Sequence, residues 1–204
     1  MPADAPGKDP DLNGSAPDTS PVALVLIDVI NDMEFEGGEK LFELALPAAK
    51  EIAALKRSAQ ACGIPVVYCN DNFGRWRADF HEVVAHCLQE GVRGRPIAEL
   101  LHPDDDDYFV LKPKHSAFYA TTFDLLLDYL ETRTLVMAGF SGDVCVQLSA
   151  ADAFLRDLKL YVPADCTASI TREYNDRALA YMRRVLDVDT TPWRDLDLEA
   201  LGRK

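Results

Sequence analysis

Residues 22–29 read VALVLIDV, an apolar run rich in Val, Leu and Ile that is broken only by Asp28. Runs of this kind are typical of strands that are buried on both faces of a parallel sheet. Residues 40–63 follow with apolar side chains at helical spacing and end on Gly63, a common residue at helix C-termini. This part of the chain therefore predicts a buried strand followed by a long helix.

The same alternation of strand and helix continues along the chain. No internal repeat or linker interrupts it after residue 20. The order predicts a three-layer α/β/α sandwich of Rossmann-like type, with right-handed crossovers around a mainly parallel sheet of five to six strands. The later strands are expected at 64–70, 108–113, 134–140, 159–166 and 187–191, and the later helices at 79–91, 121–133, 144–158 and 171–186.

The composition argues against some classes of partner. Lys and Arg number 21 against 34 Asp and Glu, which gives a formal net charge of −13. A nucleic-acid partner needs a basic face, so we expect none. No apolar run reaches the roughly 18 residues of a membrane span, so no membrane segment is expected. Part of the acidity is HPDDDDY at 102–108, which we interpret as a solvated loop.

Residues 1–20 differ from the rest of the chain. They are rich in Pro, Asp, Ser and Gly, and they lack the basic start and apolar core of a signal peptide. We expect a disordered tail over 1–20 and one domain over 21–204.

The five cysteines are widely spaced, odd in number and without a C-x-x-C pair. This usage argues against a disulfide framework or a zinc knuckle. Together with the missing signal peptide, it predicts a protein of the reducing cytoplasm. We interpret all but one as packing residues, namely Cys62, Cys69, Cys87 and Cys166.

Reactive side chains follow three of the predicted strands. Asp28 lies at the end of the first strand, Lys112 at the end of the strand near 108–113, and Cys145 after the strand at 134–140. Because ligands bind outside the carboxyl ends of strands in open α/β sheets, these groups should converge at one edge. A base, a cation and a thiol are the parts of an activated nucleophile.

Each of these residues also has an ordinary alternative. Asp28 could cap a helix or hold a neighbouring loop, and Lys112, like Lys114, could be a surface residue. Cys145 could be a small packing residue, and a buried thiol is usually inert, whereas a thiol at a helix N-terminus is partly ionised and reactive. We favour the functional interpretation because all three side chains lie at strand ends.

Three segments resemble the motif regions of the isochorismatase-like cysteine hydrolases, in the same order and at similar spacing. The resemblance extends over nearly the whole chain after the tail, and it implies a small-molecule substrate and a homo-oligomer. The segments are LVLIDVINDM at 24–33, LKPKHSAFYATTFDLLL at 111–127 and MAGFSGDVCVQLSAADAFLRD at 137–157.

The resemblance implies a catalytic triad of Asp28, Lys112 and Cys145. Lys112 is preferred over Lys114 because of its spacing to Ser116. In the mechanism that this implies, Asp28 takes the thiol proton, Cys145 attacks a carbonyl to form a thioester, and Asp28 then protonates the leaving nitrogen and activates water.

The family also has a non-proline cis peptide bond shortly before the cysteine. By position it would join Phe140 and Ser141 here. It would turn the Ser141 N–H toward the same point as the Cys145 N–H, and two such donors make an oxyanion hole. Gly139 and Gly142 permit the tight backbone of this loop.

Nicotinamidases of the same superfamily hold a metal with an Asp-x-His pattern and a further His. Here Asp71 is present, but Phe73 stands where the His is expected, and His81 is isolated. We therefore expect no catalytic metal and no cofactor, and a metal-independent hydrolase of C–N bonds in small amides, ureides or carbamoyl compounds.

Several alternatives stay open. One is the hydrolysis of a vinyl ether, as in authentic isochorismatases, which lack the nucleophilic cysteine. Others are a non-catalytic member of the fold and a redox sensor that oxidises Cys145 reversibly, although no resolving cysteine lies close in sequence. A dinucleotide-binding protein is disfavoured, since no G-x-G-x-x-G follows the first strand.

Substrate contacts are expected from the loop after the second strand and from the residues after Ala117. Arg75 is a candidate for binding a substrate carboxylate, or it pairs with Asp79 on the surface. His115 is given no catalytic role, and Asp143 is expected to cap the helix that bears the cysteine. The predicted substrate-binding residues are Asn70, Asn72, Arg75, Trp76, Phe118 and Tyr119.

Overall fold

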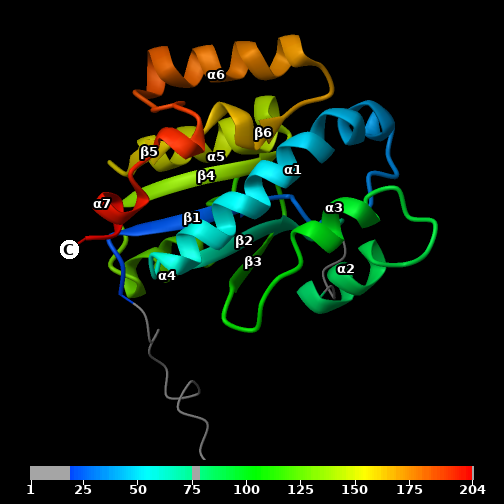
Figure 1. Ribbon diagram of the computed structural model, residues 1–204, viewed down its shortest axis with the longest axis horizontal. Helices are drawn as coiled ribbons and strands as arrows, with labels where there is room; N and C mark the ends of the chain where they lie inside the picture. Colours follow the sequence, from blue (N-terminus) through cyan, green and yellow to red (C-terminus); the bar gives the residue numbers. More distant parts are fainter. Residues whose placement is uncertain (1–18, 75–78, 204) are drawn as a thin grey trace, which may run out of the picture.

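The computed structural model describes residues 19–74 and 79–203, and its centre is one parallel sheet (Figure 1). The strand order is β3-β2-β1-β4-β5. The short strand β6 pairs with the carboxyl end of β4, after the residues of β4 that pair with β5. Every pairing in the sheet is parallel, which confirms the predicted sheet of five to six strands. The strands are β1 (Val22–Ile27), β2 (Val66–Asp71), β3 (Tyr108–Lys112), β4 (Thr134–Phe140), β5 (Lys159–Tyr161) and β6 (Thr167–Ala168).

Helices cover both faces of the sheet, so the protein has the predicted three layers. One apolar core packs β1 against α1, α2 and α3, and a second packs it against α4, α5 and α6 (Figure 1). All six residues of β1 are buried, as its unbroken apolar run predicts. The helices are α1 (Gly38–Ala61), α2 (Phe80–Cys87), α3 (Arg95–Leu100), α4 (Phe123–Tyr129), α5 (Gln147–Phe154), α6 (Arg172–Leu186) and α7 (Leu198–Gly202).

The register of the strands aligns their carboxyl ends. Ile27, the last residue of β1, pairs with Cys69 of β2 and with Gly139 of β4. Gly139 has a φ of 130°, and a Cβ there would lie 2.0 Å from the Ile27 carbonyl oxygen, so only glycine fits beside β1. The strand order changes direction between β1 and β4, which is where ligands bind in sheets of this type.

Some elements differ from the prediction. The helix α3 was not predicted, because its six residues are too few to show a helical period, and a proline at its first turn starts it. The two-residue strand β6 was missed for the same reason, and the strand expected at 187–191 is reduced to a single bridge between Asp189 and Tyr161. The described helices also end earlier than the predicted ranges at 79–91 and 121–133.

The segment before α5 is not a regular helical turn. Residues Gly142–Val146 form a π-helical turn, here η2, in which the Val146 N–H donates to the Ser141 carbonyl at 3.1 Å. Cys145 therefore lies in this wider turn rather than in the first turn of the predicted helix 144–158. Single π-turns of this kind often occur at functional sites.

The acidic run at 102–108 is only partly the solvated loop that we predicted. Lys56 of α1 is 5% exposed, and its Nζ lies 2.6 Å from Asp107 and 2.9 Å from Asp104. The Asp107 side chain is only 4% exposed, whereas that of Asp104 is 63% exposed. We call Lys56, Asp104 and Asp107 the Lys56 cluster; it joins α1 to the loop before β3.

The boundary of the predicted tail also shifts slightly. Ser20 is buried, and its N–H donates to the Leu130 carbonyl at 2.8 Å, so it belongs to the folded domain. Residues 1–18 lie outside the described residues. Among the residues that are described, no helix is long and apolar enough to cross a membrane.

Candidate active site

The carboxyl ends of β1, β3 and β4 bring together the three residues of the predicted triad. The Lys112 Nζ lies 2.7 Å from the Asp28 Oδ2 and 3.8 Å from the Cys145 Sγ. The Asp71 Oδ2 lies 4.0 Å from the same nitrogen. We call Asp28, Asp71, Lys112 and Cys145 the Lys112 cluster.

Asp28 is held firmly in a buried position. It has a φ of 51°, in the left-handed region that aspartate tolerates better than most residues. Its Oδ1 accepts the Asp71 N–H at 2.7 Å, and its Oδ2 faces Lys112. Burial raises the pKa of Asp28 above the usual value, and the neighbouring Lys112 ammonium opposes part of this rise. A carboxylate of raised pKa is better able to accept a proton near neutral pH.

Lys112, rather than its neighbour Lys114, supplies the cation of the site. The Lys112 side chain is fully buried, and its Nζ also donates to the Lys114 carbonyl at 3.3 Å. Burial alone would lower the pKa of Lys112, but the charge of the neighbouring Asp28 outweighs it, so the pKa is raised. The lysine therefore stays a cation beside the sulfur.

Burial governs the pKa of the Cys145 thiol. Cys145 is 9% exposed and lies beside the Asp28 carboxylate. Burial, followed by the Asp28 charge, raises the pKa of Cys145 to about 12, while Lys112 and the Ser141 N–H oppose the rise. This rise opposes the ionisation that a helix N-terminus favours, because Cys145 is buried beside a carboxylate.

The loop from Phe140 to Cys145 directs backbone donors at the sulfur. The Phe140–Ser141 peptide bond is cis, at the position that the family resemblance implied. The Ser141 N–H hydrogen-bonds to Cys145. The Asp143 carboxylate accepts the Ser141 hydroxyl at 2.6 Å, so its role is to hold this loop rather than to cap a regular helix as predicted.

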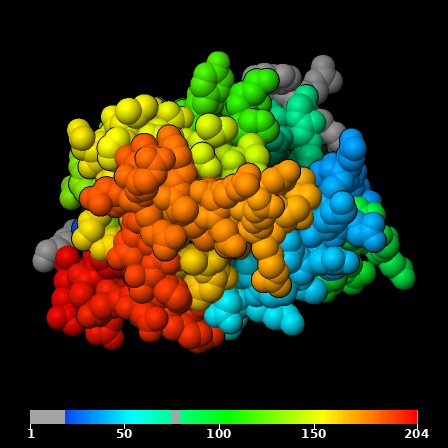
Figure 2. All heavy atoms as spheres, turned by 90° about the horizontal axis from the view of Figure 1, so that it is seen from above, coloured from blue at the N-terminus to red at the C-terminus, as the bar shows by residue number. Residues whose placement is uncertain are grey.

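A cavity of about 440 Å³ lies beside Cys145. In Figure 2 the start of α6, in orange, lies against the blue chain that follows β1, and Ile170 and Phe35 from these two segments line the cavity. A further cavity of about 400 Å³ between α1 and α6 includes no triad residue. The cavity beside Cys145 is lined by polar residues (Asp28, Asn31, Asp71, His115, Ser141, Asp143, Cys145) and by apolar or aromatic ones (Phe35, Leu41, Phe73, Phe140, Val144, Ile170, Tyr174).

The predicted substrate-binding residues that the structure describes do not line this cavity. Asn70 is fully buried because its amide accepts from the Ile30 N–H at 3.2 Å and donates to the Ile30 carbonyl at 2.7 Å. Asn72 is also buried, and its side chain accepts the Gly74 N–H. Both asparagines thus stabilise loops. Arg75 and Trp76 lie outside the described residues.

Phe118 and Tyr119 do not line the cavity either. Phe118 is 4% exposed and packs against Phe123, with a centroid distance of 4.8 Å. Tyr119 is 61% exposed on the surface. The chain turns after Lys112 and buries Phe118 in the core on the α4 side, and other aromatic residues (Phe35, Phe73, Phe140) line the cavity.

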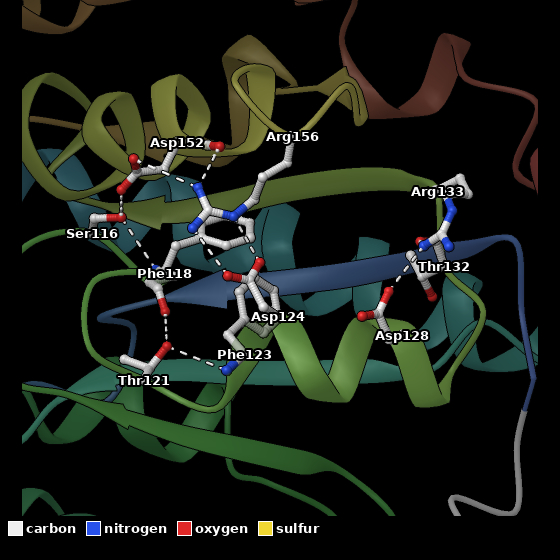
Figure 3. A network of polar contacts seen from close by, with 11 residues as sticks. Ser116, Phe118, Thr121, Phe123, Asp124, Asp128, Thr132, Arg133, Asp152 and Arg156 are labelled. Carbon is white, nitrogen blue, oxygen red and sulfur yellow. Dashed lines mark hydrogen bonds and ion pairs between the residues drawn. The ribbon is translucent and has the colours of Figure 1, made fainter.

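A polar network holds the loop that follows Lys112 against α5 (Figure 3). The Ser116 hydroxyl donates to Asp152, and Arg156 forms ion pairs with Asp152 at 3.7 Å and Asp124 at 2.7 Å. The Arg156 guanidinium also lies 4.5 Å from the Phe118 ring centroid. Because α5 follows Cys145, this network fixes the loop after β3 relative to Cys145.

Sequence reasoning missed His115 as part of the site. Its Nδ1 lies 3.6 Å from the Cys145 Sγ, and its ring is exposed at the cavity. Its position in the sequence between Lys112 and Ser116 could have indicated that it lies near the site. Ile170 and Tyr174 were missed because they follow β6, which is too short to recognise from sequence.

The residues at the nicotinamidase metal position do not fit a metal here. Phe73 lines the cavity with a side chain that cannot ligate, and His81 pairs with Asp79 on α2 at 3.0 Å. Within residues 19–74 and 79–203, no three His, Cys, Asp or Glu side chains group in a way that could hold a metal ion. We therefore derive no reaction step through a metal.

Comparison with known proteins agrees with the fold and the motifs. The isochorismatase family protein YaaI of Bacillus subtilis is 38% identical over 169 residues, which cover 83% of this chain and 92% of YaaI. The crystal structure of an isochorismatase family protein from Desulfovibrio vulgaris matches with a TM-score of 0.71 at 27% identity, covering 91% of this chain and all of that one.

A further solved structure has an enzymatic name. The N-carbamoylsarcosine amidase of Thermoplasma acidophilum matches with a TM-score of 0.62 and 27% identity, over 86% of this chain and 98% of that chain. Finally, the model of the Isochorismatase domain family matches residues 22–192. The chain therefore belongs to the isochorismatase family of hydrolases.

Proposed function

We propose that this protein is a metal-independent cysteine hydrolase that cleaves the C–N bond of a small amide, ureido or carbamoyl substrate through a thioester on Cys145. One observation carries the proposal: the Lys112 Nζ lies 2.7 Å from Asp28 and 3.8 Å from the Cys145 sulfur beside a cavity. The similarity to an N-carbamoylsarcosine amidase supports this class of substrate.

In the first step the thiol loses its proton to Asp28 while the sulfur attacks the carbonyl carbon. The raised pKa of Asp28 favours this transfer, and the Lys112 cation stabilises the negative charge on sulfur. The carbonyl oxygen gains an electron pair and is held by the Ser141 and Cys145 N–H groups, since paired backbone donors stabilise a developing oxyanion.

The intermediate then collapses and expels the nitrogen, which takes a proton from a general acid beside the cavity as the C–N bond breaks. The acyl group is left on Cys145 as a thioester. Water attacks the thioester carbon and returns one proton to that general acid, the C–S bond breaks, and the sulfur regains the proton held by Asp28. The products are a carboxylic or carbamic acid and an amine or ammonia.

The cavity limits the substrate to a small molecule. Its volume of about 440 Å³ lies at the low end of the range for ligand sites. Phe35, Phe73, Ile170 and Tyr174 form apolar parts of the wall, so substrates with an apolar group beside the scissile amide should fit best. Self-association into a homo-oligomer and a cytoplasmic location stay predictions.

The test is the release of ammonia or amine from a panel of small amides, ureides and carbamoyl acids. We expect turnover by the wild type and a loss of about 10³-fold or more in Cys145→Ala. The matched control is Cys87→Ala, which removes a buried thiol from α2 without touching the site. Activity of Cys145→Ala near that of Cys87→Ala would reject the thioester and favour chemistry without a nucleophile, such as vinyl ether hydrolysis.

A further inference from the structure

We propose that His115 is a second catalytic acid and base of this site, which protonates the leaving nitrogen and then takes a proton from the hydrolytic water. This inference rests on the proposed function. Nothing in the triad requires a histidine, yet the His115 Nδ1 lies 3.6 Å from the Cys145 sulfur. Any group bonded to the carbon that sulfur attacks must pass close to this ring.

Asp28 is poorly placed to serve the leaving group as well as the thiol. Its Oδ1 already accepts the Asp71 N–H at 2.7 Å, and its Oδ2 pairs with Lys112 at 2.7 Å. Asp28 is also 5% exposed, whereas the amine must leave, and water must enter, through the cavity. His115 is exposed at that cavity.

The charged residues around His115 include two carboxylates of the cavity wall, Asp71 and Asp143. Lys112 faces the same sulfur and is paired with Asp28, while Asp71 and Asp143 line the cavity without a lysine or arginine among its described residues. Imidazole is the side chain that ordinarily exchanges protons near neutral pH.

The protons that Asp28 and His115 accept and donate balance over one turnover. In acylation the thiol proton goes to Asp28, and the imidazolium of His115 gives its Nδ1 proton to the nitrogen as the C–N bond breaks. In deacylation water adds to the thioester carbon and gives one proton to the neutral His115 ring. The C–S bond breaks, and Asp28 returns its proton to sulfur. Amide and water become acid and amine, with both groups restored.

A matched pair of probes separates this role from a structural one. p-Nitrophenyl acetate and 4-nitroacetanilide transfer the same acetyl group, but only the anilide nitrogen needs a proton to leave, because nitrophenolate is stable without one. For His115→Gln we expect acylation by the anilide to fall about 10²–10⁴-fold, while the ester burst changes by less than about threefold.

Two controls complete the experiment. His81→Gln removes a histidine that is 82% exposed on α2 and should leave both probes unaffected. Added imidazole should restore part of the anilide cleavage in His115→Ala, as a freely diffusing acid can occupy the exposed position.

The outcomes distinguish the two proposals. Equal losses with ester and anilide in His115→Gln, or full anilide activity, would overturn the role of His115 while leaving the nucleophile in place. If the ester burst survives in Cys145→Ala, or if the wild type is acylated by neither probe, the proposed function fails and this inference fails with it.

Discussion

Lys56 and Lys112 are both buried lysines with carboxylate partners, but they lie in different parts of the molecule. The Lys56 Nζ has three oxygen partners at 3.0 Å or less: Asp107, Asp104 and the His102 carbonyl. The Lys112 Nζ has one partner at that range, Asp28 at 2.7 Å, and its other contacts are longer.

The two lysines differ in how their charge is compensated. Lys56 is fully compensated by oxygens and joins α1 to a loop. The Lys112 Nζ has one close oxygen partner and also contacts the Cys145 sulfur at 3.8 Å, so its interaction strengthens when the sulfur becomes negative. Charge compensation, and not burial, distinguishes the two clusters, and each prediction below tests that distinction.

The largest expected effect comes from Lys112→Met. We expect turnover per folded molecule to fall about 10³-fold, because the charge that stabilises the thiolate and the intermediate is lost. The measurement is kcat on the best substrate of the panel, with the folded fraction determined by circular dichroism. Activity within tenfold of the wild type would mean that Lys112 resembles Lys56 and is only structural.

The matched change, Lys56→Met, should affect stability instead. Asp107 is left buried without its cation, and breaking a buried pair in this way costs about 3–5 kcal/mol of unfolding free energy. Urea denaturation gives this difference, and kcat per folded molecule should stay that of the wild type. A large loss of specific activity without a loss of stability would show that Lys56 does not have a purely structural role.

The smallest effect concerns the pH dependence of Cys145 alkylation by iodoacetamide. Because the thiol pKa is about 12, a thiol without help should react about tenfold faster per pH unit between pH 7 and 9. If Asp28 accepts the proton internally, the rate is flat over this interval and declines only as the pH falls through the raised pKa of Asp28.

Two variants test whether Asp28 causes the flat pH dependence of alkylation. Asp28→Asn should restore a dependence on pH, since the internal acceptor is gone. Lys56→Met should leave the flat profile unchanged. A wild-type rate that climbs tenfold per unit would show that Asp28 does not share the thiol proton.

Patterns that repeat along the chain could be predicted from the sequence, and short or long-range features could not. The apolar run of β1 and the helical spacing of α1 gave the α/β fold, because burial on two faces or on one stripe leaves a periodic trace. α3 and β6 are shorter than one full period of such a pattern, so they left none.

The site follows the same rule. Asp28, Lys112 and Cys145 were found because each lies at a strand end and topology alone brings strand ends together. No comparable rule predicts the direction in which a side chain within a loop points. Asn70 points inward to Ile30 and His115 points to the sulfur, and neither orientation is encoded in spacing. Likewise, Asp107 finds Lys56 only through tertiary packing.

The most direct test of the central claim is to capture the acyl-enzyme during turnover. The protein is quenched in acid while it hydrolyses an amide, digested, and mapped by mass spectrometry. We expect an acyl group on the peptide that contains Cys145. Neutral hydroxylamine should remove this group, because it cleaves thioesters. An acyl group on another residue, or turnover that persists without one in Cys145→Ala, would contradict it.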